Sequence, residues 1–196
     1  MKNLFKYSLL SLFSILVGTP LFALPATLSL QYGLRQGLKP LSLSQAAEQL
    51  KGSGKTGLAL VEAARHLVAQ RMQYCRRNSF DTHTRAFERG YGYCQQQAFA
   101  LVDLLTRLGF NARVVGALRN RFPDGRVTGH AWVRVFVAKQ AHDIDSIAYD
   151  PTAGQITFTP LTRVFEYNPA FRIFAAWGSS AVNAWRYYRS GKDYDQ

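Results

Sequence analysis

The chain has 196 residues, 47% of them hydrophobic, which suits one domain with a substantial core plus an N-terminal extension. Its formal net charge of +12 either reflects a basic surface without a specific partner or favours acidic partners, namely an anionic envelope polymer, a membrane surface or an acidic protein. Repeats, coiled-coil heptads, low-complexity segments and nucleic-acid-binding motifs are absent from the sequence, so we expect no nucleic-acid partner.

Residues 1–24 have the features of a secretory leader. Lys2 and Lys6 give a positive start, residues 9–17 form an apolar run, and residues 18–20 interrupt it. The run is short for a membrane span, but the candidate cleavage sites lack the preferred small residue. A cleaved signal peptide and a retained N-terminal membrane anchor both fit, and either predicts an exported, periplasmic or secreted protein.

Residues 25–57 are predicted to be a loose lead-in segment, interrupted by glycine and proline. Within it, residues 44–51 favour a short helix that Ser42 or Ser44 would cap. The run GSGKTG has some features of a phosphate-binding loop, but Gln49 stands where such a loop requires its first glycine. We therefore interpret this run as a flexible turn.

Residues 58–74 have the composition of a helix, and Cys75 follows directly. The apolar residues that share one face of this helix are Leu60, Ala64, Leu67, Val68 and Met72. An exported protein with two cysteines commonly pairs them, so a disulfide between Cys75 and Cys94 is one alternative. We favour a free thiol at Cys94, because a disulfide would leave the histidine and aspartate considered below without a task.

Residues 76–93 are rich in arginine, and we predict a polar loop that borders a substrate cleft. Its arginines are either simply solvated or hold an acidic substrate. Asp81 and His83 are titratable residues within this loop, but a histidine in a loop is usually just solvated.

Cys94 begins the clearest predicted helix in the chain. Gly90 and Gly92 interrupt regular structure before it, and apolar residues then recur at i, i+3, i+4 and i+7 spacing as far as Leu108. Gly109 ends the helix, as glycine commonly does. A helix N-terminus carries unpaired N–H groups and partial positive charge, which stabilise a thiolate. Cys94 is therefore placed as a cysteine nucleophile would be.

Residues after this helix predict a β-hairpin. Residues 112–118 form its first strand, residues 122–125 its turn and residues 126–137 its second strand. In the second strand, His130 shares a face with Trp132. This face must meet the start of the Cys94 helix if the imidazole is to act on the thiol.

Residues 138–145 are predicted to be a polar turn, followed by a short strand at residues 146–150. The turn contains one histidine and two aspartates, which are too few and too generic to predict a metal site. These residues are His142, Asp143 and Asp145. Asp150 closes the short strand, either as a turn initiator before proline or as the partner of a catalytic histidine.

Cys94, His130 and Asp150 follow one another in an order that suits a cysteine triad. A neutral imidazole takes the thiol proton, and a carboxylate fixes the tautomer and stabilises the imidazolium. The runs GYCQQQAFALVDLLTRLGFNARVV, GHAWVRV and YDPT resemble the transglutaminase-like superfamily over residues 58–152. The resemblance implies an α+β, papain-like fold with helices packed on a small antiparallel sheet. It also implies that Cys94 is the nucleophile, His130 the base and Asp150 the orienting carboxylate.

The predicted function is thiol acyl transfer on an amide bond of a protein or peptide substrate, without a cofactor. The acyl-enzyme would be resolved by water or by an amine, so peptidase, amidase and cross-linking activities stay open. The catalytic core would span residues 58–154, and an aromatic-rich segment at residues 155–196 would pack on it or contact a partner. The alternative is a catalytically silent binding or assembly module of an envelope or membrane complex.

Overall fold

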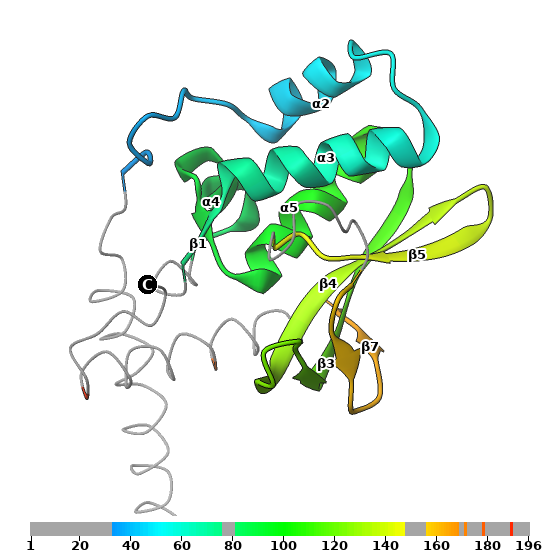
Figure 1. Ribbon diagram of the computed structural model, residues 1–196. Helices are drawn as coiled ribbons and strands as arrows, with labels where there is room; N and C mark the ends of the chain where they lie inside the picture. Colours follow the sequence, from blue (N-terminus) through cyan, green and yellow to red (C-terminus); the bar gives the residue numbers. More distant parts are fainter. Residues whose placement is uncertain are drawn as a thin grey trace, which may run out of the picture.

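The computed structural model describes residues 33–75, 81–147 and 156–168, together with Phe171, Gly178 and Arg189. The leader expected at residues 1–24 and the proposed orienting residue Asp150 lie outside the described residues. In chain order, the longer elements are α2 (Leu43–Lys51), α3 (Gly57–Arg71), α4 (His83–Arg89), α5 (Cys94–Arg107), β3 (Asn111–Arg121), β4 (Val127–Val137) and β5 (Gln140–Ile144) (Figure 1). Four two-residue strands accompany them: β1 (Gln73–Tyr74), β2 (Tyr91–Gly92), β6 (Thr159–Pro160) and β7 (Phe165–Glu166).

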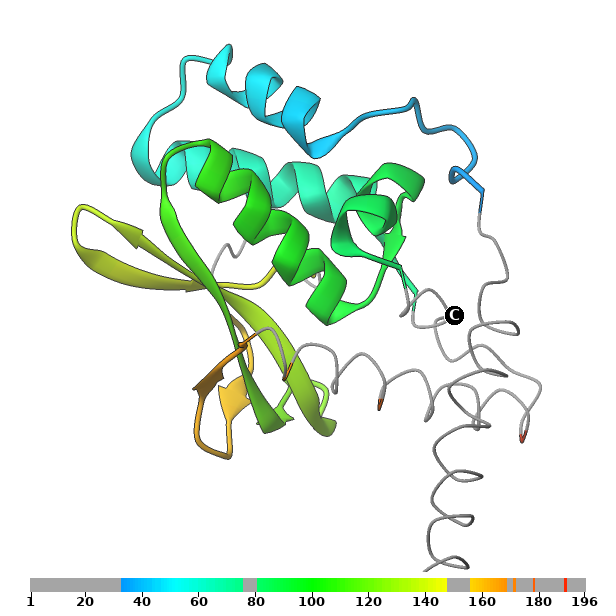
Figure 2. The ribbon, with the colours of Figure 1, turned by 180° about the vertical axis from the view of Figure 1, so that it is seen from behind.

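The fold is α+β, with the helices on one side of a curled antiparallel sheet, as the sequence predicts. Helix α5 runs through the middle of the molecule, where it contacts α2, α3 and α4 as well as β3 and β4 (Figure 2). Leu101, Leu104 and Leu105 are fully buried along α5. The helix that carries Cys94 is therefore held between the other helices and the sheet.

Both ends of α5 are where the sequence places them. The helix begins at Cys94, and the backbone N–H of Tyr93 donates to the Gln96 side-chain oxygen at 3.1 Å. Gly109 follows the last turn with a φ of 87°, a left-handed conformation that glycine adopts without strain.

Helix α2 also begins where the sequence predicts, because Ser42 and Gln45 form a capping box there. Its apolar residues Leu43, Ala46, Ala47 and Leu50 are buried in the same core as those of α5. Residues 43–51 of the lead-in segment thus contribute a helix to the core. Among the helices of the described ranges, none is long and apolar enough to cross a bilayer.

The main sheet has the strand order β5-β4-β3-β6, and β7 also pairs with β3. The predicted hairpin is confirmed as β3 and β4, which pair antiparallel with Val114 opposite Val133 and Ala117 opposite His130. The register shifts between Ala117 and Asn120, where a β-bulge interrupts β3.

The two faces of β3 and β4 serve different clusters. Val114, Val133 and Val135 pack with the helices in the larger core. The opposite face contributes to a smaller cluster made of Val115, Ala117, Phe122, Trp132 and Phe158. Phe158 therefore packs on the sheet, as expected for the aromatic-rich segment.

The prediction of a loop at residues 76–93 is wrong for residues 83–89, which form helix α4. The Thr82 hydroxyl accepts from the backbone N–H of Arg85 at 3.3 Å, which caps the helix. Ala86 and Phe87 are fully buried, and Arg71 donates to the carbonyl of Phe87 at 2.8 Å. Within residues 83–89, Ala86 and Phe87 are the buried residues, so hydrophobic periodicity gave no signal for this helix.

The polar turn predicted at residues 138–145 is also wrong. Only Ala138 and Lys139 form the turn, with φ angles of 49° and 69° that suit a tight two-residue hairpin connection. Strand β5 follows at once and pairs antiparallel with β4, which places Ile144 opposite Val133. Ser146 and Ile147, where a strand was expected to begin, form a bend instead.

Candidate active site

The backbone that leads into Cys94 is fixed by short contacts. The Gln97 side-chain amide, which is almost fully buried, donates to the carbonyl of Gly92 at 2.9 Å and to that of Met72 at 3.2 Å. A Cβ at Gly92 would meet the end of the Met72 side chain at 2.5 Å and the Gln96 side chain at 3.2 Å, so the segment passes close to both. Cys75 and Cys94 are not joined by a disulfide, and Cys94 is partly exposed at the start of α5.

His130 is a buried residue of β4 within an aromatic surround. The centroid of its ring lies 4.9 Å from that of Phe158, 5.3 Å from that of Phe122 and 6.5 Å from that of Trp132. Only a small part of the imidazole meets solvent. The ring is thus held in place by packing, and its polar atoms depend on protein partners.

Those partners are Asp145 and Cys94. Nε2 of His130 lies 3.1 Å from each carboxylate oxygen of Asp145, and the side chains are only 4% and 9% exposed. Asp145 is itself held by the backbone N–H of Ile147, which donates to it at 3.1 Å. The imidazole also hydrogen-bonds with the Cys94 side chain.

The electrostatics of this group favour a protonated imidazole. Burial alone would lower the pKa of His130, because it penalises the charged form. The charge and hydrogen bond of Asp145, with contributions of the same sign from Cys94, outweigh burial and raise the pKa from 6.5 to about 10. An imidazolium next to the sulfur stabilises the thiolate form of the cysteine.

Tyr167 packs beside α5. Its ring packs edge-on against Phe99 at 6.2 Å between centroids, and its backbone N–H donates to Val114 at 3.0 Å. Burial and then the charge of Cys94 raise the pKa of the Tyr167 hydroxyl, while a hydrogen bond with Gln95 lowers it in part. The Tyr167 hydroxyl therefore stays protonated.

Sequence reasoning brought forward Cys94 and His130, which the structure places together, but it missed Asp145. Its position follows from the pairing of β5 with β4: Ile144 lies opposite Val133, and one further step of the same register places Asp145 opposite Trp132, on the face of His130. Asp150, the predicted orienting residue, lies outside the described residues, and its role stays a prediction.

The other titratable residues considered in the sequence have separate partners. His83 lies 3.2 Å from Asp103, and Asp81 accepts from Arg89 at 2.7 Å. Asp143 accepts from Arg134 at 2.7 and 2.8 Å, so it does not share a site with Asp145.

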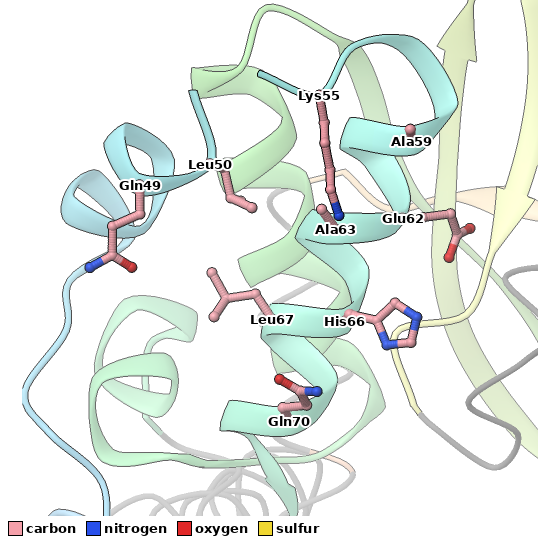
Figure 3. Close-up of a pocket in the computed structure, with 9 residues that line it drawn as sticks. All are labelled: Gln49, Leu50, Lys55, Ala59, Glu62, Ala63, His66, Leu67 and Gln70. Atoms are coloured by element: carbon pink, nitrogen blue, oxygen red, sulfur yellow. The ribbon is translucent and has the colours of Figure 1, made fainter. Parts of the chain in front are cut away.

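A second concave region lies between α2 and α3, where side chains of the two helices face each other across it (Figure 3). It encloses about 390 Å³. Its lining is Gln49, Leu50, Lys55, Ala59, Glu62, Ala63, His66, Leu67 and Gln70. It contains neither Cys94 nor His130 and is thus separate from the candidate active site.

The sequence model of the transglutaminase-like superfamily matches residues 44–151, which is more than half of the chain. The chain belongs to this superfamily. The match includes α2, part of the lead-in segment, as well as Cys94, His130 and Asp145. No curated protein sequence matches the chain.

Two solved structures are similar to this member of the superfamily. One is described as a candidate cysteine protease from Cytophaga hutchinsonii, with 16% identity and a TM-score of 0.43 over 64% of this chain and 48% of that protein. The other is described as a TGase, with 19% identity and a TM-score of 0.46 over 79% of this chain and 39% of that protein. The chain thus spans less than half the length of either protein.

Proposed function

We propose that this chain is an exported cysteine enzyme that acts on amide bonds of proteins or peptides by thiol acyl transfer. The observation that carries the proposal is the position of His130 between Cys94 and Asp145. Membership of the transglutaminase-like superfamily supports the same chemistry.

The reaction follows from the contacts of the imidazole. His130 holds the proton of the Cys94 thiol, and the thiolate attacks the amide carbonyl of the substrate. The backbone N–H of Cys94, in the first turn of α5, would donate to the oxyanion. The imidazolium then gives its proton to the leaving amine as the C–N bond breaks, which leaves a thioester. Water or a second amine attacks the thioester, loses a proton to His130 and releases Cys94.

We assign the orienting role to Asp145 instead of Asp150. Among the described residues, Asp145 contacts Nε2 of His130 at 3.1 Å, and the ring also hydrogen-bonds with Cys94. Asp145→Asn and Asp150→Asn form a matched pair of variants. We expect the first to lower turnover about 100-fold or more and the second to leave it within about twofold. The reverse result would assign the role to Asp150.

The activity itself is tested with a substrate screen. Glutamine-containing and cell-wall peptides are incubated with the full chain, with and without a primary amine, and products are identified by mass spectrometry. The proposal predicts hydrolysis or amine incorporation that disappears in Cys94→Ser. A thiol that reacts no faster than a free cysteine, together with no turnover of any peptide, would favour the silent binding module.

The export part of the proposal rests on Lys2 and Lys6 ahead of the apolar run at residues 9–17. Fusion of residues 1–32 to a reporter that is active only outside the cytoplasm tests it. An active reporter supports export, and a fusion with Leu9, Leu10 and Leu12 changed to Asp is expected to be inactive. Equal inactivity of both fusions contradicts export.

A further inference from the structure

The free end of the β3–β4 hairpin carries a surface that the proposed reaction does not use. It consists of Leu118, Arg119, Arg121, Val127, Leu161 and Arg163, here called the hairpin-end surface, and all six are exposed. Leu118, Val127 and Leu161 are 67%, 43% and 39% exposed. They are three of the five large apolar side chains that are exposed in the described residues.

Backbone pairing holds the hairpin-end surface together. The bulge places Leu118 and Arg119 opposite a single residue, Gly129, while Arg121 pairs with Val127. On the other edge of β3, the backbone N–H of Leu161 donates to the carbonyl of Arg119 at 2.8 Å. The sheet therefore joins the three chain segments that carry these residues.

The arginines of this surface differ from those elsewhere on the same sheet. Arg113 pairs with Glu166 at 2.8 Å, and Arg134 pairs with Asp143 at 2.7 Å. Among the described residues, none is a carboxylate partner for Arg119, Arg121 or Arg163. Three positive charges thus stand beside exposed apolar side chains, an arrangement that complements an acidic and apolar partner.

This surface begins next to the candidate active site. Ala117 pairs directly with His130, and the bulge that starts at Leu118 faces Gly129, the neighbour of His130. At about 3.3 Å per extended residue, Arg121 and Val127 lie about 10 Å further along the hairpin. A polypeptide that reaches the Cys94 thiol can therefore contact the hairpin-end surface with residues three to six positions away from the reacting one.

We infer that the hairpin-end surface selects polypeptide substrates that carry acidic and apolar residues three to six positions from the reacting amide. This inference rests on the proposed function, since it names the substrate class of the same site. A polypeptide fits better than a lipid surface, because the apolar side chains adjoin the reaction centre and are interspersed with arginines within one short hairpin end. Carboxylates of the substrate would pair with Arg119, Arg121 and Arg163, and its aliphatic side chains would cover Leu118 and Leu161.

Binding of labelled peptides to the full chain with Cys94→Ser tests the inference. Two acidic peptides are used. Each has one glutamine and the run Asp-Leu-Glu-Leu beginning three positions away from it, on the N-terminal side in one peptide and on the C-terminal side in the other. The comparison peptide has lysine in place of Asp and Glu. In fluorescence anisotropy at low salt, we expect at least one acidic peptide to bind about tenfold or more tightly than its lysine counterpart, and added salt to weaken it.

Two sets of substitutions identify the surface. Arg119→Gln, Arg121→Gln and Arg163→Gln together should weaken acidic-peptide binding about tenfold or more, and Leu118→Ser should weaken it severalfold. The control removes the same charge near α2, at the end of the molecule opposite the β3–β4 turn (Figure 1), by Lys39→Gln, Lys51→Gln and Lys55→Gln. This control should change binding less than about twofold. Thermal unfolding checks that each variant folds.

The outcomes separate the inference from the proposed function. Equal binding of acidic and lysine peptides, or equal loss in the two triple variants, overturns the inference. The inference is also overturned, in favour of a membrane contact, if the wild type binds anionic vesicles but not acidic peptides and the arginine variant loses the vesicle binding. Iodoacetamide labelling of Cys94 in the arginine variant should match that of the wild type. Slow labelling in the wild type would overturn the proposed function while leaving the binding result intact.

Discussion

The β4–β5 hairpin contains two pairs of a basic and an acidic residue that differ mainly in burial. At its outer end, Arg134 and Asp143 lie directly opposite each other, with side chains 34% and 23% exposed. At its inner end, His130 and Asp145 are 4% and 9% exposed among aromatic rings. Solvent screens the outer pair, whereas the inner pair controls the protonation of a histidine next to a thiol. The same ladder thus supports an ordinary surface ion pair and a candidate catalytic pair.

Removing one carboxylate from each pair should sharpen this contrast most. Asp145→Asn leaves a buried imidazole without its charge partner, so we expect a loss of about 3 kcal/mol or more in the free energy of unfolding. Asp143→Asn should cost about 0.2–1 kcal/mol, because its pair is partly solvated. Chemical denaturation at pH 7 measures both. Similar losses of unfolding free energy in the two variants would show that burial does not distinguish the two pairs.

The pH dependence of stability provides the next largest effect. The folded-state pKa of His130, about 10, lies above the unfolded value of about 6.5, so the folded chain binds this proton more tightly. Its stabilising contribution is fully present below pH 6.5 and is lost as the pH rises through 10. We expect the free energy of unfolding to fall by about 3–5 kcal/mol over this range relative to His130→Gln. A flat difference between the two chains from pH 6 to pH 10 would contradict the assignment.

A smaller effect is expected from the close packing that seats Tyr167 beside the start of α5. A Cβ at Gly116 would lie 2.6 Å from the Tyr167 ring and 2.9 Å from the carbonyl of His130. Gly116→Ala should therefore cost about 1–3 kcal/mol of stability. Gly33→Ala is the matched control, since nothing lies within 4 Å of its Cβ, and it should change stability by less than about 0.5 kcal/mol. Thermal unfolding of both variants distinguishes local crowding from a general cost of alanine.

The sequence predicted the parts of the site that local patterns specify. Helical periodicity and flanking glycines placed Cys94 at a helix start, and strand alternation placed His130 on a face with Trp132. Both predictions depend on which residues of a single helix or strand are buried, and the spacing of apolar residues along the chain shows this directly.

Asp145 was missed because its position depends on pairing between strands. Its stretch is polar, and β5 has no strong alternation and a single β-branched residue, Ile144, so it was taken for a turn. A tight two-residue turn at residues 138–139 uses non-glycine residues at positive φ, which sequence preferences disfavour. Helix α4 was missed for a similar reason, since a cap and two buried residues define it.

The most direct test of the central claim is the rate of iodoacetamide labelling at Cys94 against pH, in a Cys75→Ser background with and without His130→Ala. The account predicts rapid labelling near pH 6, because an imidazolium held by Asp145 stabilises the thiolate. In His130→Ala the profile should move to the free-thiol pKa of about 8.5. Labelling that rises only near pH 8.5 in both chains would contradict an activated cysteine at this site.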